Sequence, residues 1–301
     1  MPVAFSLDCD VVIVNYNAGA LLSDCVASIF AEGVDRIIVV DNASADGSLD
    51  ALERIDQAKP LLTVIRNQAN LGFAKACNIG AEASSAGRIL FLNPDCVLSI
   101  GALAKMISTV ESSPRIGMVG GFLSNPDGSE QPGGRRVFPT PKRAFMRAFG
   151  LSRLAKFFPE AFSDFLLHKE TLPTVPVVVE AISGACMLVK RAVVDQVGVW
   201  DEAYFLHCED LDWCMRMRLA GWNILFVPSA KITHALGVCS KSRPFFVEWH
   251  KHRGMVRFYR KFFRHQYPGV VMWLVILGVW FRFGLVVCYH AAKRVLARLK
   301  G

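Results

Sequence analysis

Two short acidic stretches hold the residues best suited to chemistry. The first is Asn93-Pro94-Asp95, which directly follows the apolar run Ile89–Leu92. A carboxylate there can hold a divalent cation against a diphosphate. The second is Glu209-Asp210-Leu211-Asp212, where three acids fall within four residues between Trp200 and Trp213. Acids in the first turn of a helix are stabilised by its dipole, but three acids exceed what capping needs.

The strand before Asp95 determines where that carboxylate lies. Ile89–Leu92 is too short for a helix and is apolar throughout, which is typical of a strand buried on both faces. Pro94 ends this strand, because proline lacks the N–H that a sheet ladder uses. Asp95 is therefore expected at the carboxyl edge of the sheet, where open α/β folds bind ligands. By itself, Asn93-Pro94-Asp95 is more simply explained as a turn.

Further polar residues are expected at the same edge. The predicted elements before Asp95 are strands over Asp10–Asn15, Arg36–Asp41, Leu62–Arg66 and Ile89–Leu92, with helical segments at 21–29 and 70–80. This alternation predicts an α/β fold with a doubly wound, mostly parallel sheet. Asn15, Asp41 and Asp95 then lie at strand ends. Asp41 can accept a hydrogen bond from a pyrimidine imide or a ribose hydroxyl, and a turn or helix-cap role is equally compatible with it.

Several functional classes are excluded by missing motifs. The first strand–helix turn lacks the G-x-G-x-x-G of dinucleotide-binding oxidoreductases, and the chain has no G-x-x-x-x-G-K-[ST] phosphate loop. The nine cysteines are odd in number and form no C-x-x-C pair. That pattern favours reduced thiols in the cytosol over a disulfide framework or a zinc site.

Five ordered motifs are similar to those of the family 2 inverting glycosyltransferases with the GT-A fold. They are Val12-Ile-Val-Asn-Tyr-Asn17, Val40-Asp-Asn-Ala-Ser-Ala-Asp-Gly-Ser48, Asn70-Leu-Gly-Phe-Ala74, Asn93-Pro-Asp95 and Glu209-Asp-Leu-Asp212. The resemblance covers roughly residues 8–240 and is strongest to bacterial rhamnosyltransferases that use dTDP-L-rhamnose. It implies a nucleotide-sugar donor held by residues that include Asn15, Asp41, Asn70, Gly72, Asn93 and Asp95.

The resemblance also implies catalytic roles. The aspartate that matches Asp210 is the family's general base, and Glu209 lies beside it near the acceptor, with Trp200 also assigned there. Asn93 stands where the family's Asp-x-Asp motif has its first aspartate, which leaves Asp95 as the carboxylate for Mg²⁺ or Mn²⁺. Periodicity leaves His234 undecided between a structural and a ligand role, and the family's His-x-x-Gly context favours metal binding.

The middle of the chain offers a third set of candidates. Arg135 and Arg136 lie in a polar loop, and guanidinium groups bind phosphates well, so Arg136 is expected near the acceptor or a diphosphate. A solvated loop is the alternative. Residues 142–168 mix aromatic and basic side chains, which suits a lid or an amphipathic membrane-surface segment. The remaining predicted elements are strands at 175–181, 184–190, 116–122 and 224–227, and a helix from 209.

The C-terminal segment, 241–301, is strongly basic and apolar. It holds thirteen Lys/Arg and one acid, which gives it a net charge of +12. Because the whole chain has a net charge of +8, residues 1–240 carry −4. This asymmetry indicates an anionic partner, and the apolar run Gly269–Phe281 favours lipid over nucleic acid. The apolar stretch reaches the roughly 20 residues of a membrane span only if Arg282 is accepted within it. A span and a re-entrant or interfacial hairpin are both compatible, and a helical pair buried in a homodimer is the third alternative.

The sequence therefore predicts a GT-A domain over 1–240, with a nucleotide-binding half (1–122) and an acceptor-binding half (123–240), followed by a helical membrane-associating tail. The expected reaction moves L-rhamnose from dTDP-L-rhamnose to a hydroxyl of a polyprenyl-diphosphate-linked saccharide at the cytoplasmic face of the plasma membrane. Galactofuranose, mannose or N-acetylglucosamine donors are alternatives with the same mechanism. A non-catalytic nucleotide-sugar or lipid-binding scaffold is the alternative from another class.

Overall fold

The computed structural model describes residues 7–34, 36–53, 62–143, 166–235 and 243–300. Within these residues, nine strands form one mixed sheet in the order β3-β2-β1-β4-β10-β6-β11-β5, with β8 paired to β11. The strands are β1 (Cys9–Asn15), β2 (Arg36–Asp41), β3 (Leu62–Arg66), β4 (Arg88–Leu92), β5 (Cys96–Leu98), β6 (Ile116–Ser124), β8 (Val177–Val179), β10 (Cys186–Lys190) and β11 (Asn223–His234). A small second sheet pairs β7 (Arg135–Arg136) with β9 (Ala181–Ile182).

The parallel half of the sheet confirms the fold predicted from the buried runs. β1 pairs in parallel with β2 and β4, and β2 pairs in parallel with β3. Residues of β1 are buried on both faces, because alternate side chains enter two different core clusters. Val12 and Val14 belong to one cluster, whereas Val11 and Ile13 belong to the other. The carboxyl ends of these parallel strands consequently share one edge.

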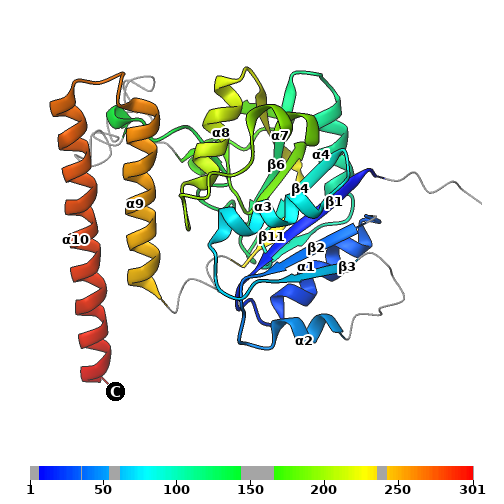
Figure 1. Ribbon diagram of the computed structural model, residues 1–301, viewed down its shortest axis with the longest axis horizontal. Coiled ribbons are helices and arrows are strands. Elements are labelled where there is room, and N and C mark those ends of the chain that lie inside the picture. The colour runs from blue at the N-terminus through cyan, green and yellow to red at the C-terminus, as the bar shows by residue number, and fades with distance from the viewer. Residues whose placement is uncertain (1–6, 35, 54–61, 144–165, 236–242, 301) are drawn as a thin grey trace, which may run out of the picture.

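Helices cover both faces of the sheet, as Figure 1 shows. They are α1 (Leu21–Ala31), α2 (Ser48–Glu53), α3 (Phe73–Ala83), α4 (Ala102–Glu111), α7 (Arg191–Val197) and α8 (Glu209–Leu219). The apolar residues of α1 and α4 join the cluster that contains Val11, and those of α3 and α8 join the cluster that contains Val12. The layered arrangement buries β1, β2 and β4 between helices, whereas β3 at the edge of the sheet stays partly exposed.

The second half of the chain enters the same sheet. β10 lies between β4 and β6 and runs antiparallel to both. The predicted boundary between 122 and 123 falls inside β6, so the two expected halves share one sheet and one core. β11 extends well beyond the predicted 224–227 segment and has an irregularity between Val227 and Lys231. His234 is consequently the last residue of a strand.

The C-terminal segment forms two helices, α9 (Pro244–Phe263) and α10 (Gly269–Lys300). Phe258 and Tyr259 of α9 are buried in the core cluster that contains α3 and α8. The first helix of the expected tail therefore packs as part of the catalytic fold. Arg282 does not interrupt α10, which is one continuous helix of 32 residues. Most of the predicted lid or amphipathic segment, 144–165, lies outside the described residues.

Candidate active site

Asn15 and Asp41 lie side by side at the carboxyl edge of the sheet. They are register partners in β1 and β2, and the Asn15 side-chain amide donates to Asp41 Oδ1 at 2.7 Å. The same amide nitrogen lies 3.0 Å from the Ser44 hydroxyl and 2.8 Å from the Ser48 hydroxyl. The backbone N–H of Ser44 donates to Asp41 Oδ2 at 3.1 Å. Asn15 is fully buried, so the structure brings these two predicted residues together with Asn15 holding Asp41 in position.

Asn70 and Gly72 form the turn that begins α3. Asn70 Oδ1 accepts from the backbone N–H of Gly72 at 2.9 Å, and Asn42 donates to the Gly72 carbonyl at 3.1 Å. Gly72 has a φ of +88°, and a Cβ at this position would lie 2.7 Å from the Phe205 carbonyl oxygen. Only glycine fits both conditions. This turn therefore fixes the loop around Phe205, which leads to the acidic pair at 209–210.

Asp95 and His234 meet at the ends of β4 and β11. Their side chains are buried, and Asp95 Oδ1 lies 3.1 Å from His234 Nε2. The Gln131 amide nitrogen donates to the His234 carbonyl at 2.6 Å, which leaves Gln131 Oε1 to accept from His234 Nδ1 at 2.8 Å. This pairing puts a proton on Nδ1 and turns Nε2 toward the Asp95 carboxylate. An imidazole nitrogen and a carboxylate oxygen at this separation can share one divalent cation, so the donor set fits a metal.

Cys96 and Asn93 border this pair. The Cys96 thiol lies with Asp95 and His234 in a buried group whose ligand atoms are within 4.8 Å of one another. Burial and the nearby Asp95 carboxylate raise the pKa of Cys96 well above its usual value. Its thiol donates to the Ala185 carbonyl at 3.5 Å, so Asp95 and His234 are the better candidates for metal ligands. The Asn93 backbone N–H donates to the same carbonyl at 2.9 Å.

Asp210 lies in the first turn of α8, where two groups hold its carboxylate. The Arg136 guanidinium forms an ion pair with Asp210 Oδ2, and the Gly184 backbone N–H donates to the same oxygen at 3.2 Å. Burial alone would raise the pKa of Asp210, but Arg136 and the backbone donors outweigh it and hold the pKa below its usual value. Asp210 is thus a carboxylate at neutral pH, as a proton acceptor must be.

Glu209 has the opposite electrostatic environment from its neighbour. Its side chain is 6% exposed, and its Oε2 has no hydrogen-bond partner among the described residues. Burial, followed by the negative charge of Asp210, raises the pKa of Glu209 well above its usual range. Two adjacent acids with pKa values driven apart can serve different roles. Asp210 suits proton acceptance, and the orphaned oxygen of Glu209 suits a hydrogen bond to a bound hydroxyl.

Trp200, which was expected near the acceptor, and Arg135, one of the two loop arginines, are both buried in the structure. The Trp200 ring is 2% exposed and packs against Trp213 with ring centroids 4.4 Å apart. It supports the site from the core and presents no surface to an acceptor, because α3 and α8 cover it. Arg135 is also unavailable to a phosphate: Glu130 accepts from its Nε at 2.7 Å, and its guanidinium lies over the Phe226 ring. Arg136 contacts Asp210 itself.

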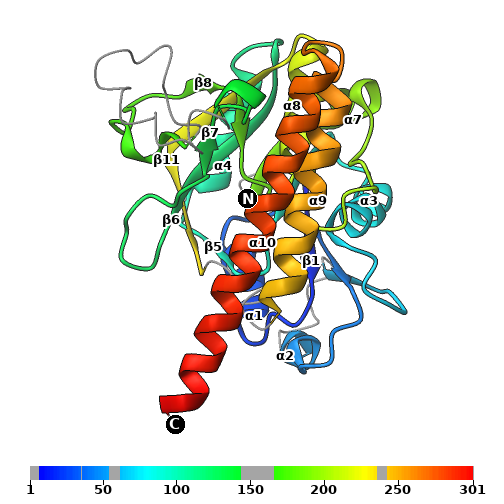
Figure 2. The same cartoon turned by 90° about the vertical axis from the view of Figure 1, so that its left-hand side faces the viewer.

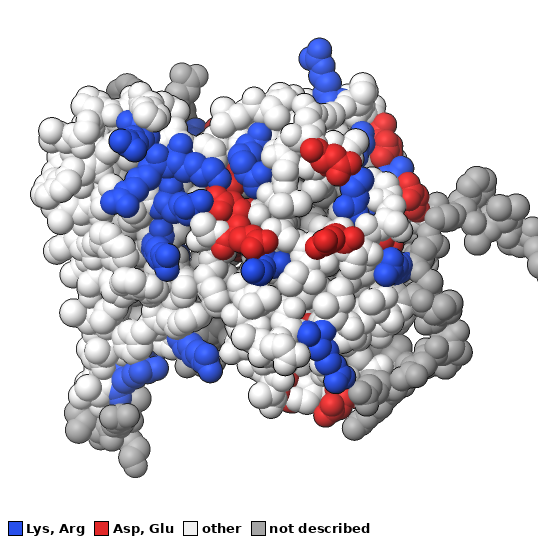
Figure 3. Space-filling view, in the orientation of Figure 1, with Lys and Arg blue, Asp and Glu red and all other residues white. Residues whose placement is uncertain are grey.

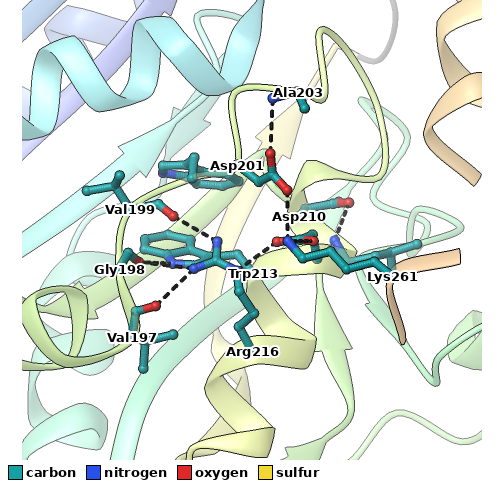
Figure 4. Close-up of polar contacts among 12 residues, drawn as sticks. Val197, Gly198, Val199, Asp201, Ala203, Asp210, Trp213, Arg216 and Lys261 are labelled. Atoms are coloured by element: carbon teal, nitrogen blue, oxygen red, sulfur yellow. Dashed lines mark hydrogen bonds and ion pairs between the residues drawn. The ribbon is translucent and has the colours of Figure 1, made fainter. Parts of the chain in front are cut away.

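A charged network joins α8 to α9, as Figure 4 shows. Asp212 is fully buried, and its two oxygens accept from Arg216 Nε at 2.7 Å and Lys261 Nζ at 2.6 Å. Lys261 also contacts Asp201 at 2.7 Å. Arg216 in turn donates to the carbonyls of residues 197–199. The third acid of the predicted motif is therefore structural, because it anchors α9 beside Asp210.

Comparison with known proteins identifies the family. Residues 10–198 match the family model described as Glycosyl transferase family 2. The chain belongs to this family. It is 32% identical over 237 residues to the N-acetylglucosaminyl-diphospho-decaprenol L-rhamnosyltransferase of Mycobacterium tuberculosis, across 74% of this chain and 75% of that protein. It is 30% identical over 146 residues to the rhamnosyltransferase WbbL of Escherichia coli, across 48% of this chain and 51% of that protein.

Solved structures confirm the GT-A fold. The mannosyltransferase PcManGT from Pyrobaculum calidifontis, solved with GDP-Man and Mn²⁺, has a TM-score of 0.58 at 16% identity and covers 100% of this chain and 79% of its own. GalNAc-T7, solved with UDP, GalNAc and Mn²⁺, has a TM-score of 0.56 at 20% identity and covers 77% of this chain and 44% of its own. The protein is a family 2 glycosyltransferase, as the motifs predicted.

Three residues of this glycosyltransferase site were not predicted from the sequence. Gln131 orients His234, Gly184 donates to Asp210, and Lys261 holds Asp212. None carries a spacing signal, because each partner lies far away in the chain. The residue types offered the only hint. Gln131 lies in a loop rich in polar residues, and Gly184 is the glycine of Ser183-Gly184, which lies between two apolar runs.

Lys261→Met is expected to destabilise the glycosyltransferase by about 1–3 kcal/mol, because Asp212 would keep only one of its two partners while remaining buried. Urea denaturation of the two proteins measures this difference. Lys251→Met is the matched control, since Lys251 is on the same helix and its Glu248 partner is near the surface. We expect a change below about 0.5 kcal/mol there. Equal effects of the two substitutions would contradict the anchoring role.

Arg136→Met is expected to move the acid limb of the profile of kcat/KM against pH to higher pH. Burial raises the pKa of Asp210, and Arg136 is the main group that lowers it, so losing the guanidinium lets the pKa rise. Asp210 is then protonated, and inactive as a base, over a wider acidic range. Arg136→Lys keeps the charge and should shift the limb less. An unchanged acid limb in both variants would mean that Asp210 does not control it.

Proposed function

We propose that this enzyme is an inverting rhamnosyltransferase. It would transfer L-rhamnose from dTDP-L-rhamnose to a hydroxyl of a polyprenyl-diphosphate-linked saccharide at the cytoplasmic face of the plasma membrane. The observation that carries the catalytic part is the Asp210 carboxylate, kept ionised by Arg136 and Gly184. The donor and acceptor are supported by the likeness to the mycobacterial rhamnosyltransferase.

In the proposed reaction, the acceptor hydroxyl oxygen attacks the anomeric carbon of the donor sugar from the face opposite the nucleotide. The bond from that carbon to the diphosphate breaks as the new glycosidic bond forms, and the hydroxyl proton passes to a carboxylate oxygen of Asp210. Glu209 holds the acceptor beside Asp210. One displacement inverts the anomeric centre, so no covalent nucleophile on the protein is needed.

The donor nucleotide would lie along the strand ends. Asp41, held by Asn15, accepts from the base or ribose, and the turn at Asn70 and Gly72 borders the same pocket. Asp95 and His234 would hold Mg²⁺ or Mn²⁺, whose ligand preferences their oxygen and nitrogen atoms meet. Bound there, the ion would offset the charge of the departing diphosphate. Asn93 borders this position from the end of the same strand.

The proposal is tested by incubating the purified full-length protein with nucleotide-activated L-rhamnose, galactofuranose, mannose and N-acetylglucosamine. Each reaction contains a polyprenyl-diphosphate-linked N-acetylglucosamine acceptor, and mass spectrometry identifies the product. Transfer is expected mainly from dTDP-L-rhamnose, with inversion detected by NMR of the new linkage. Faster transfer from another donor would assign that donor's sugar to the enzyme in place of rhamnose. Nucleotide-sugar binding without transfer from any of the four donors would support the scaffold alternative.

A further inference from the structure

Helix α10 packs against α9 along nearly the whole length of α9. Pairs of contacting side chains run from one end of the pair to the other: Trp249 with Trp280 at 5.2 Å, His252 with Phe283 at 5.4 Å, and Phe245 with His290 at 6.1 Å between ring centroids. At the opposite end, Met272 is buried in the cluster that holds Phe263. The two helices therefore lie antiparallel and side by side, as Figures 1 and 2 both show.

The other side of α9 is fixed to the catalytic domain. A Cβ added to Gly254 would lie 2.8 Å from the His207 carbonyl, so the backbones meet closely there. Lys261 binds Asp212, and the ring of Phe258 packs 6.2 Å from that of Phe138. One helix thus separates α10 from the catalytic domain over the length of α9 (Figure 1).

The outward side of α10 is a continuous exposed apolar face. It repeats at helical spacing and includes Val270, Trp273, Leu274, Leu277, Phe281, Leu285, Tyr289 and Leu296, each more than half exposed. Within Gly269–Leu296, an 18-residue stretch reaches a mean hydropathy of 2.3, and only 6% of that stretch is buried. Soluble proteins rarely leave such a long apolar face in water.

The packing of α10 decides how it can meet a bilayer. At 1.5 Å per residue, the 20 residues of α9 extend about 30 Å, which matches the thickness of the hydrocarbon layer. If α10 crossed the membrane in this arrangement, α9 would cross beside it. The charges of Arg253, Arg257 and Arg260 would then enter the hydrocarbon, where a charged side chain is strongly disfavoured. The attached sheet domain would enter as well.

We infer that α10 does not span the membrane but lies in the plane of an anionic lipid surface, with its exposed apolar face in the lipid. This inference rests on the membrane association in the proposed function and gives that association a geometry. Arg282 fits it, because its guanidinium lies 3.5 Å from His252 Nε2, on the side of α10 that faces α9.

Charge complementarity identifies the lipid as anionic. A concavity of about 720 Å³ lies along the seam between the two helices, and its lining includes Arg253, Arg257, Arg260, Lys261 and Trp280. Figure 3 shows a group of Lys and Arg side chains on the face over α9, with acidic side chains at its border. If α10 lies at the boundary of the hydrocarbon layer, the basic residues that line this concavity lie at the level of the lipid phosphate groups. Arg257 and Lys261 already pair with Asp201, so Arg253 and Arg260 are the cations of this lining that anionic head groups would attract.

A topology experiment tests the inference on the full-length protein. Protease-cleavable epitopes are placed before Met1 and after Gly301, and cleavage is followed in inverted membrane vesicles and in intact spheroplasts. We expect both epitopes to be cleaved in inverted vesicles and protected in spheroplasts. Cleavage of the C-terminal epitope only in spheroplasts would mean that α10 spans, and would overturn the inference. Neither result depends on which sugar is transferred.

A binding experiment tests the apolar face directly. The double variant Leu277→Glu, Phe281→Glu is expected to lose at least about 10-fold in co-sedimentation with vesicles that contain phosphatidylglycerol, because it places two charges in the lipid-facing row. Ile100→Glu is the control, since Ile100 is 86% exposed but lies outside α10. Wild-type protein should bind phosphatidylcholine vesicles more weakly. If the double variant keeps vesicle binding and instead turns a dimer into monomers, a second copy covers this face and the inference is wrong.

Discussion

Asp210→Asn is expected to lower turnover by about 100-fold or more, with little change in donor affinity. The substitution keeps the shape of the side chain and a hydrogen-bond acceptor for Arg136 and Gly184, but the amide cannot take the acceptor proton. Single-turnover rates with saturating donor, together with donor binding measured by calorimetry, separate these two effects. Thermal unfolding of the variant checks that the loss of the ion pair leaves the fold intact.

Glu209→Gln provides the comparison that decides between the neighbouring acids. The raised pKa of Glu209 means that this side chain is protonated over much of the neutral range, so a neutral amide should mimic it closely. We therefore expect Glu209→Gln to leave turnover nearly unchanged, with any effect confined to the acceptor KM. The reverse pattern, with near-normal turnover in Asp210→Asn and a large loss in Glu209→Gln, would assign the base to Glu209.

Most of the helices and strands that carry this site could be predicted from the sequence, because each one produces a local pattern of residues. Three predicted strands match in their bounds or nearly so, since continuous apolar runs ended by polar residues are typical of buried parallel strands. The position of Asn15, Asp41 and Asp95 at one edge of the sheet then followed from the fold class. The acidic first turn of α8 was also local, because helix dipoles favour acids there.

The contacts that set the chemistry were not readable, because they join residues distant in sequence. Arg136 pairs with Asp210 across 74 positions, and Gln131 orients His234 across 103 positions. The antiparallel position of β10 between β4 and β6 was not predicted either, because it too depends on contacts between residues that are distant in the sequence. Arg282 shows the limit of composition: it interrupts the apolar run in the sequence, and only the structure shows that it faces His252 of α9 within one continuous helix.

Removal of divalent metal is expected to abolish transfer, and Mg²⁺ or Mn²⁺ should restore it. Asp95 Oδ1 and His234 Nε2 lie 3.1 Å apart in a buried site, which is close enough for both atoms to bind one cation. Asp95→Ala and His234→Ala each remove one ligand, so both should require much more metal for half-maximal activity. Gln131→Ala leaves both ligands but frees the imidazole, and it should weaken metal binding by about 10-fold to 100-fold.

Mn²⁺ binding measured by electron paramagnetic resonance tests this site without relying on turnover. Cys96→Ala is the matched control. Its thiol is in the same buried group but donates to the Ala185 carbonyl, so its loss should leave Mn²⁺ affinity nearly unchanged. A larger loss in Cys96→Ala than in His234→Ala would move the ligand role to the thiol. Full activity of the wild type after exhaustive chelation, with no Mn²⁺ bound, would show that Asp95 and His234 pair through a proton, and Asp95 would then be a donor-sugar contact.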